Sequence, residues 1–101
     1  MQDGKATSKM QNVINDELFP DQCRAARGLL NWSQEALSKE SGVTKKTIAD
    51  FERGAVSKPQ SRTLRDLRAA FERSGLEFIA PNGGGAGVRW RDNPAKLAPT
   101  E

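Results

Sequence analysis

The stretch SQEALSKESGVTKKTIADFERG, from Ser33 to Gly54, decides the fold of this chain. It holds two short runs with helical spacing of apolar residues, and Gly42 separates them. Glycine readily adopts the left-handed backbone conformation that ends many helices. Ser33 and Thr44 are favoured residues directly before a helix. The stretch therefore predicts a helix, a glycine turn and a second helix that ends at Gly54.

Two further helical segments flank this pair. The segment PDQCRAARGLLN, from Pro20 to about Asn31, begins with a proline, which a first helical turn tolerates, and repeats small or apolar residues at helical spacing. The segment QSRTLRDLRAAFERSG, which ends at Gly75, is the longest amphipathic run, because its leucines and arginines fall on opposite sides of a helix. Four helices therefore account for the centre of the chain.

The apolar pattern changes after residue 75 from a helical period to a period of two. The segments LEFI and GVRW alternate and flank the loop APNGGGA, so they predict a β-hairpin over residues 76–91. A two-stranded hairpin is marginal in water on its own. We therefore expect its apolar face to form or border a dimer interface, with packing on its own domain as the alternative. The residues of that face are Leu76, Phe78, Val88 and Trp90.

The two ends of the chain carry no sustained pattern. Residues 1–18 are mostly polar and predict a partly disordered arm. Residues 92–101 hold two prolines and few apolar side chains, and predict a disordered tail. The expected helical domain occupies residues 19–75.

The composition excludes several classes of protein. The chain has 101 residues, a net charge of +3, one cysteine and no histidine. A lone cysteine forms no intramolecular disulfide, and without histidine neither a zinc site nor the commonest acid or base catalyst is expected. The sequence has neither a spanning apolar run nor a signal-sequence pattern at its N-terminus. We expect a cytoplasmic, non-enzymatic protein without metal, cofactor, small-molecule ligand or membrane contact.

Positive charge gathers in the predicted helices. Residues 21–75 carry eleven Lys or Arg against seven Asp or Glu, whereas the segments on either side have no positive excess. A basic centre favours a surface that binds phosphate groups.

The central residues resemble those of the XRE class of helix-turn-helix regulators, the lambda-repressor and Cro-like family. The resemblance covers residues 21–75. Its matching positions are Gln34-Glu35-Ala36-Leu37, Ser41-Gly42-Val43-Thr44, Thr47-Ile48, Phe51-Glu52-Arg53-Gly54, Pro59, Thr63-Leu64 and Leu67. It implies a mainly α fold, a four- to five-helix DNA-binding domain, here followed by the β-hairpin. It also implies a dimer whose third helix enters the major groove of double-stranded DNA.

The resemblance assigns base contacts to the third helix. Its first residues reach base edges in the family, and this sequence has Lys45, Lys46, Thr47 and Asp50 there. Lysine donates to guanine, threonine touches a thymine methyl group or a polar edge, and aspartate accepts from the cytosine amino group. A lysine without a rigid fork can also grip phosphate.

Further roles follow from the same resemblance and from position. The expected phosphate contacts are Ser33, Gln34, Thr44, Arg53, Lys58 and Arg62. Gln34 matches a phosphate-binding residue of the family and stands at a helix N-terminus. Arg27 and Glu52 match a buried ion pair between the first and third helices, so we assign them to the fold and not to DNA.

The sequence thus predicts a homodimeric, sequence-specific transcription regulator that binds an inverted-repeat operator. Repression is the default, and autoregulation or activation stays open. One alternative is the antitoxin of a toxin–antitoxin pair, which uses the same domain with a protein-binding segment. Another is a protein-interaction adaptor that has lost DNA binding, although the basic centre argues against it.

Overall fold

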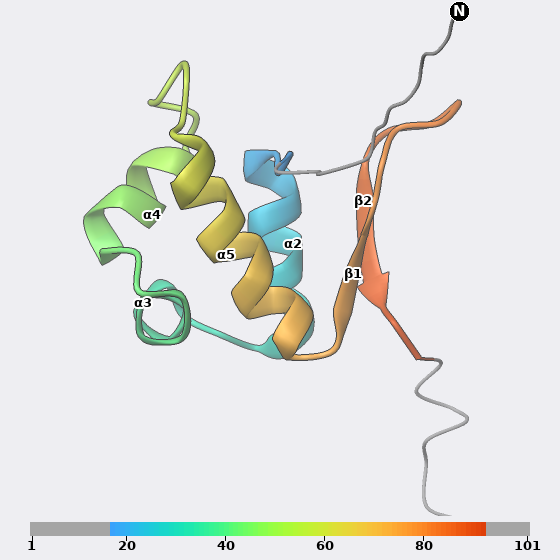
Figure 1. Ribbon diagram of the computed structural model, residues 1–101, viewed down its shortest axis with the longest axis horizontal. Coiled ribbons are helices and arrows are strands. Elements are labelled where there is room, and N and C mark those ends of the chain that lie inside the picture. Colours follow the sequence, from blue (N-terminus) through green and yellow to red (C-terminus); the bar gives the residue numbers. More distant parts are fainter. Residues whose placement is uncertain (1–16, 93–101) are drawn as a thin grey trace, which may run out of the picture.

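The computed structural model describes residues 17–92, which form a small helical domain followed by a β-hairpin (Figure 1). In chain order the elements are α2 (Pro20–Leu30), α3 (Gln34–Ser41), α4 (Lys45–Glu52), α5 (Ser61–Arg73), β1 (Leu76–Ile79) and β2 (Gly87–Trp90). This arrangement confirms the predicted fold class. The predictions of disorder in the arm and tail fall on residues 1–16 and 93–101, which lie outside the described residues.

One residue of the predicted arm belongs to the core. Leu18 is 4% exposed and packs with the buried side chains of the helices. It directly precedes Phe19, the residue that caps α2. An apolar residue at this position often packs against the first turns of its helix, so the packed domain includes Leu18 and does not begin at residue 19.

The turns between the helices contain the helix-capping residues and the glycine that the sequence predicts there. The Ser33 hydroxyl oxygen accepts a hydrogen bond from the backbone N–H of Ala36 at 3.0 Å and caps α3. The Thr44 hydroxyl oxygen accepts from the backbone N–H of Thr47 at 3.2 Å and caps α4. Gly42, at φ 81°, makes the turn between these helices in a region that side-chain-bearing residues rarely adopt. α3 and α4 are thereby set at an angle around a turn of three residues.

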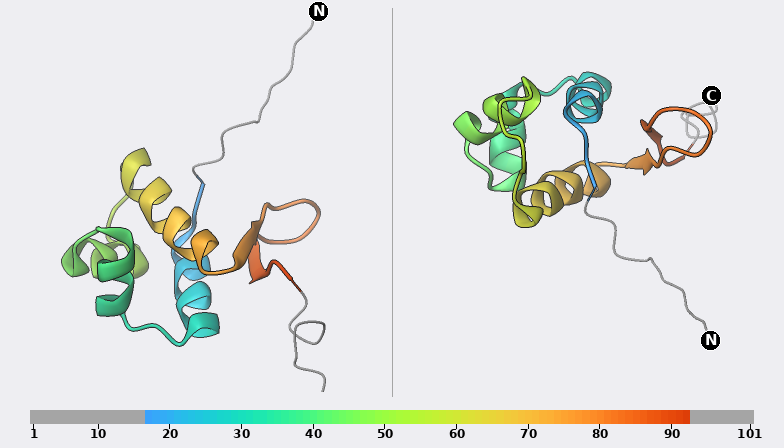
Figure 2. Two further views of the ribbon diagram at one scale, coloured as in Figure 1. Left: turned by 60° about the horizontal axis from the view of Figure 1, so that its bottom comes forward. Right: turned by 90° about the horizontal axis from the view of Figure 1, so that it is seen from above.

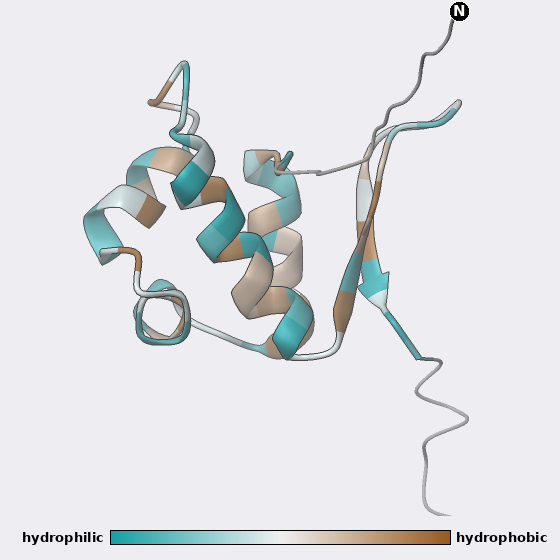
Figure 3. Cartoon of the chain, in the orientation of Figure 1, coloured by the Kyte–Doolittle hydropathy of each residue, from teal (hydrophilic) through white to brown (hydrophobic). Residues whose placement is uncertain are grey.

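The core lies between the four helices. Leu37 of α3, Ile48 of α4 and both Leu67 and Phe71 of α5 are fully buried. In Figure 3, hydrophobic and hydrophilic stretches alternate along α4 and α5, as expected of helices with one buried side. α4 therefore has a fixed orientation, because its apolar side faces the core and packs against α2 and α3.

The hairpin lies on the far side of α2 and α5 from α4 (Figures 1 and 2). Its strands are antiparallel, with Leu76 opposite Trp90 and Phe78 opposite Val88. Leu76 is buried in the core, and the other three side chains pack against the core of their own domain. The apolar face thus packs on its own domain, which was the stated alternative to a dimer interface. Dimerisation through or beside the hairpin stays a prediction.

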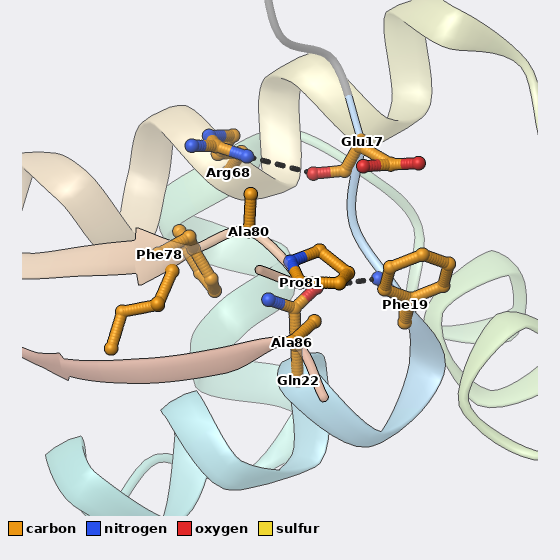
Figure 4. A pocket seen from close by; sticks show the side chains of 9 residues that line it. Glu17, Phe19, Gln22, Arg68, Phe78, Ala80, Pro81 and Ala86 are labelled. Carbon is orange, nitrogen blue, oxygen red and sulfur yellow. Dashed lines mark hydrogen bonds between the residues drawn. The ribbon is translucent and has the colours of Figure 1, made fainter. Parts of the chain in front are cut away.

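Polar contacts also fix the hairpin to the helices. Gln22 Nε2 donates to the Gly87 carbonyl oxygen at 2.9 Å, and Arg91 Nη2 donates to the Glu72 carbonyl oxygen at 2.8 Å. A cavity of about 10 Å³ remains between the hairpin, α2 and the segment before it (Figure 4). Arg68 closes one side through a 2.8 Å hydrogen bond to the Glu17 carbonyl oxygen. Such a volume holds about one water molecule and no organic ligand.

Candidate nucleic-acid interface

α4 has one buried side and one exposed side. Ile48, Phe51 and Glu52 are at most 3% exposed and face the core. The other side, called here the exposed side of α4, carries the charged groups of the helix. It consists of Lys45, Lys46, Ala49, Asp50 and Arg53. A short helix that is held by its apolar side thus presents amine, carboxylate and guanidinium groups in a row.

Two of the predicted base-contact residues are paired with each other. Lys46 Nζ lies 3.0 Å from Asp50 Oδ2, and Arg53 Nη2 lies 2.9 Å from Asp50 Oδ1. The hydrogen bond from Lys46, followed by that from Arg53, holds the pKa of Asp50 below its usual range. The carboxylate therefore stays ionised at neutral pH and keeps both cations close to the helix.

The remaining two predicted base-contact residues lie in the first turn of α4. Lys45 is exposed, and Thr47 is half-buried, with its backbone N–H bonded to the Thr44 cap. Lys45, Lys46 and Asp50 are thus brought together on one side of the helix. Thr47 lies at the edge of this side, beside the segment that leads to α5.

Arg27 and Glu52 form an ion pair inside the domain. Arg27 Nη2 lies 2.7 Å from Glu52 Oε1, and Arg27 Nε donates to Oε2 at 2.8 Å. These two parallel contacts are the strongest geometry for an arginine and a carboxylate. They join α2 to the end of α4 at a residue that is 3% exposed.

Two further donors complete what is called here the Glu52 cluster. Gln34 Nε2 donates to Glu52 Oε1 at 3.0 Å, and the Cys23 thiol donates to Oε2 at 3.1 Å. Burial opposes ionisation of Glu52, but the hydrogen bonds from Arg27, Gln34 and Cys23 outweigh it and hold its pKa below the ordinary value. Burial, helped by the bond to Glu52, raises the pKa of the Cys23 thiol, which stays a donor.

Sequence reasoning missed two members of this region. It assigned no role to Arg24, whose Nη1 donates to the Glu52 carbonyl oxygen, and of Cys23, the lone cysteine, it said only that no intramolecular disulfide forms. The available signal is spacing, because Cys23 and Arg27 are four residues apart and share one side of a helix. A partner of Arg27 therefore also comes within reach of Cys23.

A hollow of about 440 Å³ opens between α2, α3 and α4, next to the exposed side of α4. It is lined by Arg24, Arg27, Gln34, Ala49, Glu52 and Arg53. The lining holds three arginines and one glutamate, so positive charge is in excess there and favours an anion. It is called below the three-arginine hollow.

The predicted phosphate contacts, apart from Arg62, lie around α4. Ser33 and Gln34 are at the start of α3, and Gln34 and Arg53 both line the three-arginine hollow. Thr44 is the cap of α4. Lys58 lines a second hollow of about 330 Å³, together with Thr47, between α4 and the start of α5. Arg62 belongs to neither hollow and lies 4.0 Å from Asp66 on exposed α5 surface.

Two other kinds of site are absent from the described residues. Within residues 17–92, no helix has the length and apolar character needed to cross a membrane. The same residues hold no cluster of three or more Cys, Asp or Glu that could bind a metal ion.

Comparison with known proteins gives one result that bears on this geometry. A comparison with curated proteins finds no match. The family model described as "Helix-turn-helix" matches residues 24–78, which is more than half of the chain. The matched region begins at Arg24 in α2 and includes α3, the Gly42 turn and α4. The chain therefore belongs to the helix-turn-helix family of the XRE and lambda-repressor type, a family of DNA-binding regulators.

Proposed function

We propose that this protein is a sequence-specific transcription regulator, which acts as a homodimeric repressor on an inverted-repeat operator. The observation that carries the proposal is the orientation of α4. Its apolar side faces the core and packs against α2 and α3, while Lys45, Lys46 and Asp50 are left on the exposed side. An α-helix fits the major groove of B-DNA, where amine and carboxylate groups distinguish the base pairs.

In this proposal α4 enters the groove with its first turns. Lys45 and Lys46 donate to the O6 and N7 acceptors of guanine, and Thr47 contacts a thymine methyl group or a polar base edge. Asp50 accepts from a cytosine amino group with the lone pairs that the two cations leave free. These four contacts read sequence.

Phosphate contacts on both sides of the groove position the helix. Gln34 keeps its second amide N–H for a phosphate oxygen while the first is bonded to Glu52. Arg53 lines the three-arginine hollow on the same side, Lys58 lines the second hollow, and Arg62 lies on α5. Ser33 and Thr44, at the N-termini of α3 and α4, also contact phosphate groups of the DNA backbone in this proposal. Such contacts fix the register of the protein but read no base.

Dimerisation is proposed beside the apolar face of the hairpin. The four apolar side chains are occupied by their own domain. Among residues 17–92 the sheet has two strands, so each strand keeps one edge without a neighbouring strand from this part of the chain. Open edges readily pair with a second chain. Two copies of α4 would then lie in successive major grooves, about 10 bp apart. The expected compartment is the one that holds the DNA, the cytoplasm.

The proposal is tested with the full-length protein and a random library of DNA duplexes. Selection of bound duplexes should yield an inverted repeat, and sedimentation should give a dimer. Affinity for the selected sequence should fall with salt at a log–log slope of about −0.9 for each phosphate neutralised. Recovery of no common sequence, or an affinity that ignores salt, would contradict the proposed function.

A further inference from the structure

We propose that Asp50 is a specificity-determining residue, which holds Lys46 and Arg53 in place and weakens binding to DNA of the wrong sequence. This inference rests on the proposed function, because it assumes that the exposed side of α4 faces DNA. It gives Asp50 a role toward its neighbours that goes beyond a contact of its own with a base.

The three residues form a continuous row along α4. Asp50 follows Lys46 by four positions and precedes Arg53 by three, so all three share one side of the helix. Each carboxylate oxygen accepts from a different cation, at 3.0 Å and 2.9 Å. The side chains of Lys46 and Arg53 are 84% and 68% exposed, whereas that of Asp50 is 26% exposed. Asp50 is thus the fixed centre between two cations that reach into solvent.

Stability does not account for this arrangement. Ion pairs between exposed side chains contribute little to folding, since solvent screens the charges and each long side chain loses freedom. Asp50 also stands in the last turn of α4, where a negative charge opposes the helix dipole. A carboxylate at this position is therefore better explained by its holding of Lys46 and Arg53 in place.

The row favours base contacts over phosphate contacts for Lys46. An ammonium group has three N–H donors, so Lys46 can donate to a base edge while one N–H stays bonded to Asp50. A phosphate in the same place would bring its negative charge toward the Asp50 carboxylate, and like charges at an interface are repulsive. DNA sequences that offer no acceptor to the Lys46 ammonium group therefore bind without the affinity that it contributes. Specificity rises because DNA of the wrong sequence binds more weakly.

The test is Asp50→Asn in the full-length protein, with Glu72→Gln as the matched control. The control also removes one negative charge and one ion pair from the last turn of a helix, because Glu72 Oε2 lies 3.0 Å from Arg68 Nε on α5, outside the proposed DNA and dimer contacts. Affinity is measured by fluorescence anisotropy for the sequence selected by the unaltered protein and for a scrambled duplex of the same length, over a series of salt concentrations.

We expect Asp50→Asn to lower the ratio of specific to non-specific affinity by about tenfold, the size typical of one wrong base pair. Non-specific affinity should rise and its salt slope should steepen by about 0.9, because a released cation neutralises one more phosphate. Glu72→Gln should leave the ratio unchanged. Equal changes in both affinities, or a ratio that falls as far in the control, would overturn the inference. Absence of any preferred sequence for the unaltered protein would instead contradict the proposed function itself.

Discussion

Asp50 and Glu52 stand two residues apart on α4, and their surroundings differ in nearly every respect. Glu52 is 3% exposed and accepts hydrogen bonds from Arg27, Gln34 and Cys23. Asp50 lies on the exposed side of the helix and accepts from Lys46 and Arg53. Both carboxylates have a lowered pKa. The shared direction of the pKa shift therefore says little about function, and burial separates the two roles.

Burial decides which property each carboxylate controls. A buried charge that loses its partner cannot regain the hydration that it had in the unfolded chain, so the Glu52 cluster acts on stability. An exposed carboxylate is hydrated with or without its partners, so Asp50 acts on what approaches the helix. Variants of the two carboxylates and of their partners should separate these two properties.

Removal of the partner of Glu52 should have the largest effect. Arg27→Ala leaves the carboxylate in the interior without its bidentate partner, and should lower the free energy of unfolding by about 3–5 kcal/mol. Urea unfolding followed by tryptophan fluorescence measures this loss. Arg89→Ala is the matched control, because it breaks an exposed pair with Glu77 and should have little effect. Equal losses in the free energy of unfolding would show that the buried ion pair matters no more to stability than the exposed one.

Replacement of a proposed base contact should come next. Lys46→Ala should weaken binding to the selected sequence about tenfold and binding to other DNA less, because a base contact carries discrimination. Gln34→Ala should weaken both by a similar factor, because a phosphate contact reads no base. Lys39→Ala, at the opposite end of α3 from Gln34, controls for the loss of one positive charge. The division of roles is wrong if Lys46→Ala and Gln34→Ala lose only affinity for non-selected DNA.

Much of the fold could be predicted from local residue types. Ser33, Gly42 and Thr44 set the helix boundaries through side chains and backbone angles that depend on immediate neighbours. The alternation in the hairpin likewise predicted its strands and their apolar face. What that face covers could not be predicted, since the same four side chains can contact their own core or a second chain. Leu18 was missed because a single apolar residue has no period.

The candidate site was predictable only in part. The pairing of Arg27 with Glu52 came from the resemblance, because nothing in the sequence alone brings residues 25 positions apart together. The ion pairs of Lys46 and Arg53 with Asp50 follow from helical spacing and could have been predicted. The place of Arg24 at the end of α4 depends on the packing of α2 against α4, which only the tertiary structure supplies.

Acid should act on Glu52 more than on Asp50. The folded-state pKa of Glu52 is below its ordinary value of 4.5, so its contribution to stability is complete above that value and is lost as pH falls through the folded pKa. Urea midpoints between pH 7 and pH 3 should therefore decline, and Glu52→Gln should flatten the decline. Asp50→Asn should flatten it less, because solvent screens its partners. A decline unchanged by Glu52→Gln would contradict the role of this carboxylate.

The smallest effect is expected for Asp50→Asn on stability at pH 7. The change breaks two exposed ion pairs, but it also removes a negative charge from the last turn of α4, where the helix dipole disfavours it. These contributions are small and opposite, so the urea midpoint should match that of the unaltered protein, as it should for Glu72→Gln. A clearly lower midpoint for Asp50→Asn alone would make Asp50 a structural residue like Glu52. Any change in its DNA binding would then follow from a loosened α4, and the contrast between the two carboxylates would fail.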